Sequence, residues 1–366
     1  MFTQLSLGEH IFLKRPNMTE KFPCALLIND SHASKDNIPE FHKNWNEALK
    51  ICKDNNIQYL IVGGDLWQSR SSQTLDTLMS VREAILEATK QYGLYVVLAN
   101  GNHDLVDQEA ILGYSHIFSD YESVEVIDDY TEIDLTDNVS LWVMSYFPEN
   151  GSFTQRFNEL LKTNCINRSK KNILYIHEGI RGGLATPSDD ELPANLFSAF
   201  DTTLVGHYHN RKRIPGTNIE YIGASRQHNF GEDEEKGYTI LYSDGSTKFI
   251  KNEINIRYKV IDTDIADMDD KFMAMLAKIK SDSRYKVKVR VKCESAQSSS
   301  VNKQKLAEYG ANKIELVTEQ TIVTHSDHQN ITHKFDKSGI KEEYTTFCSQ
   351  KSIDNQLGLH YLEKLN

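Results

Sequence analysis

The sequence lacks the features that mark a membrane or secreted protein. No apolar run in its 366 residues approaches the roughly 18 residues that a membrane-spanning helix needs. Residues 1–20 contain no apolar core followed by a cleavage site, so we predict no secretory signal. The five cysteines are scattered, and none stands in a C-x-x-C pair, which favours reduced, buried thiols. We therefore expect a soluble, cytoplasmic protein without a membrane partner.

The chain also lacks a net positive charge. It carries 41 Lys and Arg against 52 Asp and Glu, a formal charge of −11. This balance argues against a simple basic coat for nucleic acid. It does not exclude action on nucleic acid at one place, because local patches and metal ions set the field that a phosphate meets. There is no internal repeat, and the length suggests about two to three domains.

Residues 23–252 alternate between short apolar runs and segments of helical period. Apolar side chains recur every three or four residues within 41–52, 75–85 and 153–161, which predicts helices. Strands alternating with helices indicate an α/β domain whose sheet is covered on both faces. The apolar runs that we predict as strands are 25–28, 59–62, 94–98, 141–144, 173–176 and 203–205, with later strands near 220–223 and 238–242.

The pattern changes after about residue 253. A turn and helix at 262–280, an alternating strand at 284–292, a helix at 303–309 and a strand at 313–317 predict a small α+β domain over 253–323. Beyond it we expect a polar linker at 324–340 and a helical tail at 341–366. In that tail Ile353, Leu357 and Tyr361 recur at spacings of four. Residues 1–22 form an N-terminal extension.

Seven metal-capable residues follow directly on five of the predicted strands. Parallel sheets place their reactive residues at the carboxyl ends of strands, so the agreement between motif and strand position is a second signal. D-x-H and G-D are common by chance, but the complete ordered set is not. The residues are Asp30 and His32, Asp65, Asn102, His177, and His207 with His209.

This residue set suits a two-metal site that hydrolyses phosphate esters. Two divalent ions about 3.5–4 Å apart neutralise the phosphate and lower the pKa of a water. A carboxylate bridges such a pair best, and Asp65 is the candidate. The absence of thiolate favours Mn²⁺, Fe or Zn²⁺. One ion would take Asp30, His32, Asp65 and His209, and the other would take Asp65, Asn102, His177 and His207.

His103 is better placed as an acid–base group than as a ligand. It directly follows Asn102, so it should face the leaving group and donate a proton to it. Asp104 is predicted to orient His103 and to favour its charged form. His228 follows a strand and can approach the site. We interpret the acidic run 232–235 as a solvated loop.

The segment 284–292 reads RYKVKVRVK and places five cations on one face, with no acid among them. Each cation that meets a DNA phosphate releases counterions and adds salt-dependent affinity. Two other readings remain open: an edge strand protected by lysine, and a solvated face. The candidate nucleic-acid contacts are Arg284, Lys286, Lys288, Arg290 and Lys292.

The ordered motifs resemble the calcineurin-like metallophosphoesterase superfamily over about residues 24–245. Within it, segments 177–183, 221–225 and 230–238 are most similar to SbcD-type DNA-repair exonuclease subunits and their counterparts in large bacteriophages. The resemblance implies a β-sandwich flanked by helices in four layers (αββα) and Mn²⁺-dependent cleavage of DNA ends. It also implies a DNA-capping domain over 253–323 and an SbcC-type ATPase partner bound through the tail.

The chain departs from the family pattern at Ser34, where a glycine is usual, and at Gln68, where a histidine or aspartate is common. The N-terminal extension is also longer than usual. We expect a DNA exo/endonuclease subunit in a bacterial or phage-infected host cytoplasm. Related subunits form dimers, so a homodimer is an option. The alternatives are a metallophosphatase or small-molecule phosphodiesterase, and a non-catalytic scaffold for an ATPase.

Overall fold

The computed structural model describes residues 21–107, 110–148, 152–163, 166–184 and 191–318, and in the tail 341, 344–345, 347–349, 351 and 354–364. The chain divides into two units. The first comprises residues 1–292 and 299–317, and the second comprises 293–298 and 318–366. Most of the predicted N-terminal extension, the predicted linker and Ile353 lie outside the described residues.

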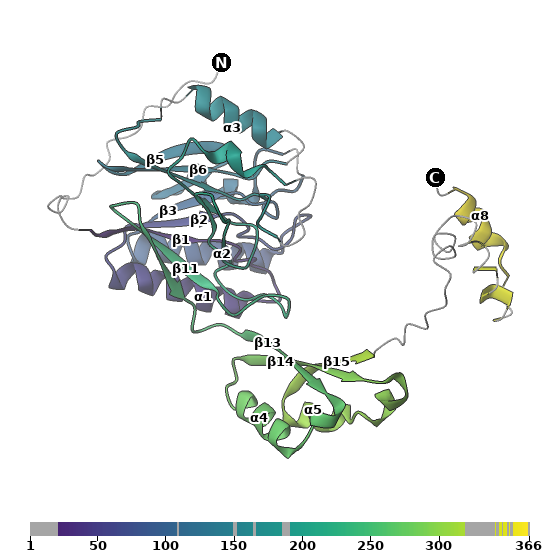
Figure 1. Cartoon of the computed structure of the whole chain (residues 1–366). Helices are drawn as coiled ribbons and strands as arrows, with labels where there is room; N and C mark the ends of the chain where they lie inside the picture. The colour runs from purple at the N-terminus through teal and green to yellow at the C-terminus, as the bar shows by residue number, and fades with distance from the viewer. Residues whose placement is uncertain are drawn as a thin grey trace. The chain divides into compact units, whose positions relative to one another are not determined.

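The first sheet has six strands in the order β12-β11-β1-β2-β3-β4 (Figure 1). Its neighbours β1, β2, β3 and β4 run parallel, and β11 pairs antiparallel with β1. The predicted strands near 25, 59, 94 and 238 all belong here. The bounds are β1 Pro23–Ile28, β2 Tyr59–Gly63, β3 Tyr95–Ala99, β4 Val124–Ile127, β11 Gly237–Tyr242 and β12 Thr247–Lys251.

The second sheet also has six strands, in the order β5-β6-β7-β8-β10-β9. Its central strands β6, β7, β8 and β10 run parallel, and β5 and β9 pair antiparallel at the two edges. The bounds are β5 Tyr130–Thr136, β6 Val139–Met144, β7 Lys171–Ile176, β8 Thr202–Val205, β9 Lys212–Arg213 and β10 Ile219–Tyr221.

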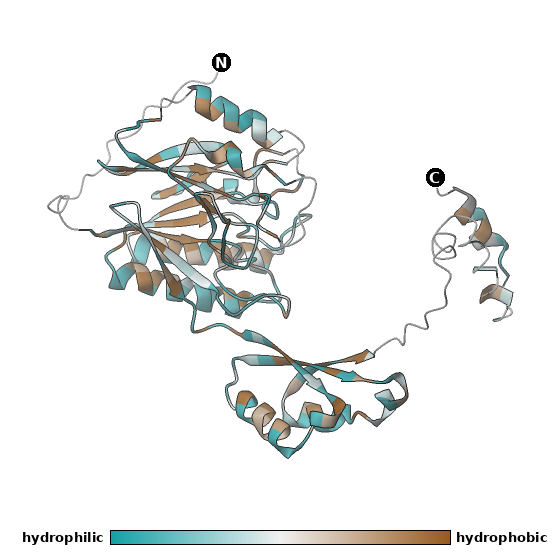
Figure 2. Cartoon of the chain, in the orientation of Figure 1, coloured by the Kyte–Doolittle hydropathy of each residue, from teal (hydrophilic) through white to brown (hydrophobic). Residues whose placement is uncertain are grey.

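The two sheets pack face to face with helices on their outer faces. Alternate residues of β1 show the division: Leu27 lies in the core between the sheets, while Leu26 and Ile28 lie under the helices. Helices α1 (Ile38–Asp54) and α2 (Leu75–Leu86) cover the first sheet, and α3 (Ser152–Thr163) covers the second. Figure 2 shows the apolar colour of the strands between them. The prediction of a helix-flanked β-sandwich is confirmed.

The predicted helix periods match the buried faces. In α1 the fully buried Trp45 lies one turn from Phe41, and Pro39 at the start of the helix suits a position whose N–H needs no partner. In α2 the Thr74 side chain accepts a hydrogen bond from Thr77 N at 3.3 Å, which caps the helix. Among the described residues, the shorter helices are one π-helix and four 3₁₀-helices. The π-helix is η1 Glu87–Gln91, and the 3₁₀-helices are η2 Tyr114–Phe118, η3 Ala194–Phe197, η4 Ile265–Asp267 and η5 Ser295–Ser300.

A three-stranded sheet in the order β13-β14-β15 follows, with two helices. Val287, Val289 and Val291 are fully buried, so the predicted alternation in the basic segment is confirmed. The edge-strand reading of that segment is wrong, because β14 lies between its two neighbours. The turn predicted at residue 262 is instead the end of a strand. The bounds are β13 Arg257–Asp264, α4 Asp270–Lys280, β14 Tyr285–Cys293, α5 Lys303–Tyr309 and β15 Ala311–Thr318.

The described part of the tail contains helix α8, which spans Gln356–Lys364. The helix therefore begins after Ile353 and includes Leu357 and Tyr361. Cys24, Cys52, Cys293 and Cys348 are buried free thiols, as predicted for these four. In the part of the chain that the structure describes, no helix has both the length and the apolarity that crossing a bilayer requires.

Candidate active site

The seven candidate ligands come together where the carboxyl ends of both sheets meet. Asp30 and His32 follow β1, Asp65 follows β2, and Asn102 follows β3. These strands are adjacent and parallel, so their ends lie side by side. The remaining ligands, His177, His207 and His209, follow the adjacent parallel strands β7 and β8 of the second sheet.

Asp65 lies at the centre of this group. Its Oδ2 is 3.6 Å from His32 Nε2 and 3.4 Å from His177 Nε2. Asp30 Oδ1 lies 3.8 Å from His177 Nε2 and 3.7 Å from His209 Nε2. One oxygen of Asp65 therefore faces imidazoles from both predicted metal positions, as a bridging carboxylate must.

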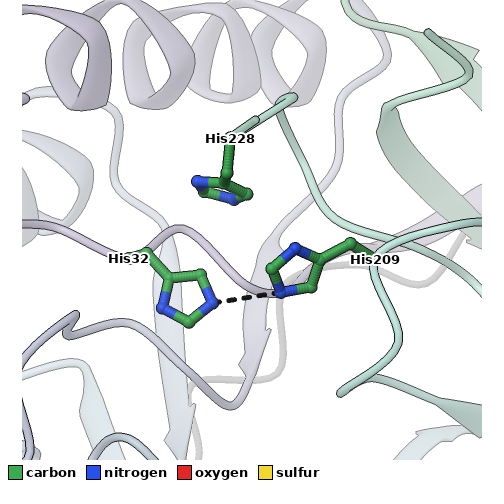
Figure 3. A group of neighbouring side chains, drawn as sticks. All are labelled: His32, His209 and His228. Carbon is green, nitrogen blue, oxygen red and sulfur yellow. Dashed lines mark hydrogen bonds between the residues drawn. The ribbon is translucent and has the colours of Figure 1, made fainter. Parts of the chain in front are cut away.

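The ligands of each predicted metal position also approach one another. His32 Nε2 is 3.2 Å from His209 Nε2, and Figure 3 shows these two rings pointing toward each other. On the other side, His207 Nδ1 is 3.0 Å from Asn102 Oδ1. The four side chains thus pair in the two groups that the sequence predicted.

Four of the candidate ligands have a strained backbone. Asp30, His32, Asp65 and His207 have φ values of 50°, 46°, 52° and 80°. Non-glycine residues in this region cost about 1–3 kcal/mol each and persist where the surroundings hold them. Here Asp30 N donates to Gly64 O at 3.1 Å, and His32 N donates to Asp65 O at 2.9 Å.

The glycines of the motifs are required by close approach. A Cβ on Gly64 would lie 2.4 Å from His177 Nδ1, and φ at this glycine is +113°. A Cβ on Gly101 would lie 2.3 Å from Asp65 Oδ1. The G-D and G-N-H-D glycines therefore let the ligand loops pack against one another without being ligands themselves.

The residues at the site fit divalent cations. Asp30 is fully buried, yet neither of its carboxylate oxygens has a hydrogen-bond partner among the described residues. The buried His177 Nε2 likewise has no hydrogen-bond partner among these residues. A buried carboxylate without a partner is costly, and a cation would satisfy it. Imidazole, carboxylate and amide donors without thiolate suit Mn²⁺, Fe or Zn²⁺. Two further ligand-like groups also form, around His32, Asp65 and His103 and around His32, His209 and His228.

The charges of the site follow from burial and from Asp65. Burial lowers the pKa of His32 and of His207 to about 3, which keeps both rings in the neutral, ligating form. Burial also disfavours a charged His177, but Asp65 outweighs it and raises the pKa of His177 to about 9. Conversely, burial opposes the charge of Asp65, but His177 and His32 hold its pKa well below the usual range. Burial raises the pKa of Asp30, an effect that a bound cation would reverse.

His103 lines a cavity that opens over the candidate ligands. Its Nδ1 is 2.7 Å from the carbonyl oxygen of Gln68, which can only accept, so Nδ1 carries a hydrogen. Its backbone N donates to Asp65 Oδ1 at 2.8 Å. The hydrogen bond to Gln68 uses Nδ1, so Nε2 is the ring nitrogen that remains for a proton transfer.

The prediction that Asp104 orients His103 is wrong. Asp104 is fully buried, and its oxygens accept hydrogen bonds from the backbone N–H of Asp65, Trp67 and Gly101 at 2.7, 2.9 and 2.6 Å. The carbonyl of Gln68 takes the position at His103 that the sequence assigned to Asp104. Asp104 instead ties the loop after β2 to the loop after β3.

Two residues near the site follow β10. Figure 3 shows His228 beside His32 and His209, and its ring centroid lies 4.9 Å from the first and 5.0 Å from the second. Its Nε2 is 2.7 Å from the carbonyl oxygen of Asp30, so the approach that the sequence suggested is observed. Glu232 is 2.8 Å from His209 Nδ1. The interpretation of this residue as part of a solvated loop is wrong.

The family resemblance of segment 230–238 included Glu232 but gave it no role, because its partner lies 23 residues away. Two other histidines have contacts outside the candidate site: His42 lies 2.9 Å from Ser80, and His116 lies 2.6 Å from Asp128.

A cavity of about 220 Å³ opens over the ligands. A second hollow, of about 770 Å³, is lined by residues of the loop after β10 and of β13 and β14. Among them are Phe230, Tyr258, Lys259, Lys288 and Arg290. The first cavity is lined by His32, Asp65, Gln68, Asn102, His103, His207, His209, His228 and Asn229.

The basic face of β14 is less positive than its sequence suggests, because the neighbouring strands supply acids. Arg290 pairs with Asp262 of β13 at 2.7 Å, and Lys288 pairs with Glu315 of β15 at 2.5 Å. Arg284 pairs with Asp282 at 2.7 Å. Lys286 lies over the ring of Tyr258 at 5.6 Å, and Lys292 is exposed. Nucleic-acid binding by these five residues stays a prediction.

The fold and the site define a metal-dependent phosphoesterase. The chain belongs to the calcineurin-like phosphoesterase family, whose model matches residues 25–211. The predicted superfamily and the class of hydrolase acting on phosphoester bonds are confirmed at the level of this family. The family uses divalent metal ions, and the chain has the candidate ligands.

Individual relatives are distant. Putative phosphoesterase 078R of Invertebrate iridescent virus 3 is 25% identical over 244 residues, 63% of this chain and 65% of the relative. The SbcD component of nuclease SbcCD from Staphylococcus saprophyticus is 24% identical over 220 residues, 53% of this chain and 57% of the relative. Putative phosphoesterase 244L of Invertebrate iridescent virus 6 is 24% identical over 76% of this chain and 97% of its own length. The matches thus span less than two thirds of the first two relatives, and the likeness to SbcD is weak and partial.

Solved structures resemble the chain only loosely. A dimetal phosphatase from Danio rerio has a TM-score of 0.38 and 10% identity over 54% of this chain and 86% of its own. Pseudomonas putida nuclease MPE has a TM-score of 0.24 and 16% identity over 51% of this chain and 61% of its own.

Proposed function

We propose that the protein is a metal-dependent DNA exo/endonuclease subunit that hydrolyses phosphodiester bonds in DNA end processing, recombination and repair. The family supports the bond class, and the relative named as part of a nuclease supports the substrate. The position of the loop after β10 supports a polymeric substrate over a small phosphate ester. Its residues 228 and 229 line the cavity over the ligands, and residues 230–234 line the second hollow.

That loop offers one continuous surface to a substrate longer than a mononucleotide. With one phosphate over the ligands, the neighbouring nucleotides would reach Phe230 and Tyr258, whose rings lie 5.1 Å apart. Aromatic side chains stack on bases without sequence preference. The second hollow carries acids as well as cations, and Lys259 lies over the ring of Tyr285 at 5.8 Å. A small phosphate ester would use only the first cavity.

The residues proposed to hold the first ion are Asp30, His32, Asp65 and His209, and those for the second are Asp65, Asn102, His177 and His207. We propose Mn²⁺ as the resident metal, with Fe or Zn²⁺ as substitutes. When bound, the ions would neutralise the phosphate and lower the pKa of a water molecule.

His103 is the proposed acid for the leaving group. The hydrogen bond from its Nδ1 to Gln68 O leaves Nε2 as the nitrogen that gives a proton to the departing oxygen. Gln68 also lines the cavity, where its neutral amide replaces the histidine or aspartate that is common in the family. The amide can donate a hydrogen bond to a phosphate but cannot exchange a proton with it.

The decisive experiment is cleavage of end-labelled linear double-stranded DNA with Mn²⁺, beside hydrolysis of bis(p-nitrophenyl) phosphate. We expect the wild type to cut DNA, and His103→Ala to lower the rate by about 10²–10⁴-fold, the usual contribution of a general acid. Hydrolysis of the small ester without cleavage of DNA, with or without an ATPase partner, would contradict the nuclease proposal. A His103→Ala rate equal to wild type would contradict the assigned acid.

Lys286 tests whether the small domain contacts DNA. This lysine is exposed and lies over an aromatic ring rather than against a carboxylate. In Lys286→Ala we expect weaker DNA binding, with the slope of log affinity against log salt reduced by about 1, the value for one lost phosphate contact. Hydrolysis of the small ester should not change. Lys50→Ala on α1 is the matched control, and an equal effect in both variants would count against a specific contact.

The first alternative function is a metallophosphatase or small-molecule phosphodiesterase, which the small cavity over the ligands and the phosphoesterase relatives support. The second is a non-catalytic scaffold for an ATPase. The presence of all seven candidate ligands together with His103 argues against the scaffold.

We further propose two partners besides DNA. An SbcC-type ATPase would bind the tail, whose Phe347 and Tyr361 are 53% and 63% exposed. A second copy of the chain would bind the first unit, where large apolar side chains are exposed on α2 and on the segment after Asp104. These side chains are Leu75, Met79, Val106, Ile111, Leu112 and Ile117.

A further inference from the structure

Glu232 differs from the acids that follow it in the loop after β10. Its side chain is 8% exposed, whereas those of Asp233 and Glu235 are 45% and 58% exposed. Asp233 pairs with Lys236, and Glu235 pairs with Lys251. Because Glu232 is buried, its carboxylate needs hydrogen-bond donors inside the protein, whereas the exposed Asp233 and Glu235 can also be hydrated.

The partner is a candidate metal ligand. Glu232 Oε1 lies 2.8 Å from His209 Nδ1 and 2.7 Å from Asn229 Nδ2. Its other oxygen accepts a hydrogen bond from His228 N at 3.0 Å. Because a carboxylate only accepts, Nδ1 of His209 carries the hydrogen, and Nε2 keeps its lone pair for a metal ion. That Nε2 is the atom closest to His32 and Asp30.

We propose that Glu232 is a positioning residue that holds the His209 ring in the orientation and tautomer required for metal binding. Carboxylates that bind the second nitrogen of a ligating imidazole orient the ring and raise its basicity. Neither the ligand motifs nor the family match, which ends at residue 211, includes Glu232. The proposal rests on the proposed role of His209 as a ligand.

The loop that carries Glu232 is anchored by Gln227, which is 1% exposed. Gln227 Nε2 donates to Glu232 O at 2.8 Å and to Tyr258 O at 2.8 Å, and Gln227 Oε1 accepts from Tyr258 N at 2.8 Å. One side-chain amide therefore ties the backbone of Glu232 to β13. This anchor explains how an acid from a surface loop keeps a fixed position beside His209.

The test is Mn²⁺ binding by isothermal titration calorimetry in the full-length protein, for wild type, Glu232→Ala and Glu232→Gln. We expect two ions in the wild type. In Glu232→Ala we expect one ion to bind about 10–100-fold more weakly, the usual loss when such a partner is removed, while the other keeps its affinity. Glu232→Gln retains an acceptor for His209 Nδ1 and should recover part of the loss. Glu235→Ala, from the same acidic run, should bind like wild type.

The outcomes separate this proposal from the nuclease proposal. Wild-type Mn²⁺ affinity for both ions in Glu232→Ala would overturn the role of Glu232, whether or not the protein cuts DNA. An equal loss for both ions with a lowered melting temperature would also overturn it, because that pattern indicates a general structural role. Selective weakening of one ion in a protein that cuts no DNA would support Glu232 while contradicting the nuclease proposal. A wild type that binds no Mn²⁺ would overturn both.

Discussion

Replacing Asp65 with alanine is expected to remove both metal ions and to lower DNA cleavage by about 10³-fold or more. The ions are worth several kcal/mol of charge stabilisation in the transition state, and each 1.4 kcal/mol is about tenfold in rate. Asp65 Oδ2 lies 3.6 Å from His32 Nε2 and 3.4 Å from His177 Nε2, so it faces an imidazole from each predicted position. Asp30 Oδ1 also lies within 4 Å of imidazoles from both positions, but the sequence assigns the bridge to Asp65.

The same substitution should lower the pKa of His177 in the metal-free protein. Without the carboxylate, His177 loses the main group that raises its pKa, and burial then disfavours its charged form. Calorimetric titration with Mn²⁺ and the rate on end-labelled DNA measure the loss of metal and of activity. Asp54→Ala, which removes an exposed acid from α1, is the control and should behave like wild type. Two ions bound with wild-type affinity in Asp65→Ala would contradict the bridging assignment.

Asp104→Ala is expected to destabilise the protein by about 3–5 kcal/mol and to abolish most of its activity. The substitution leaves the backbone N–H groups of Asp65, Trp67 and Gly101 without their acceptor in a fully buried place. Each buried donor that loses its partner costs about 1–3 kcal/mol. Two of these groups belong to the loop that presents Asp65, so the site should lose its geometry together with its stability.

Thermal unfolding compared with activity distinguishes this role from the one that the sequence suggested. His103→Ala should lose activity while it keeps its melting temperature, because the ring lies in the cavity wall and, among the described residues, its hydrogen bond is to the carbonyl of Gln68. Asp104→Ala should lose both. If Asp104→Ala kept the wild-type melting temperature and matched His103→Ala in rate, Asp104 would act through His103, against the contacts that the structure shows.

Much of the candidate site was predictable from the sequence because its information is local. A candidate ligand such as Asp30 or Asp65 follows a run of apolar residues, and the end of a buried parallel strand is where a polar side chain reaches a shared edge. The spacing of Phe41, Trp45 and Leu49 likewise predicted α1, because a helix buries one face at 3.6 residues per turn. The edge strands β4, β5, β9 and β12 of the two large sheets were missed, because they are short or have polar residues between their apolar ones.

The sequence by itself determined the candidate ligands and the order in which the strands present them, since both are properties of short segments. Only the tertiary structure decided their partners. Asp104 meets the loop of Asp65 rather than its neighbour His103, Glu232 meets His209 across 23 residues, and Asp262 neutralises Arg290 from an adjacent strand. These contacts depend on which loops and strands lie side by side. Tertiary packing sets that arrangement, and the spacing of residues within one segment does not predict it.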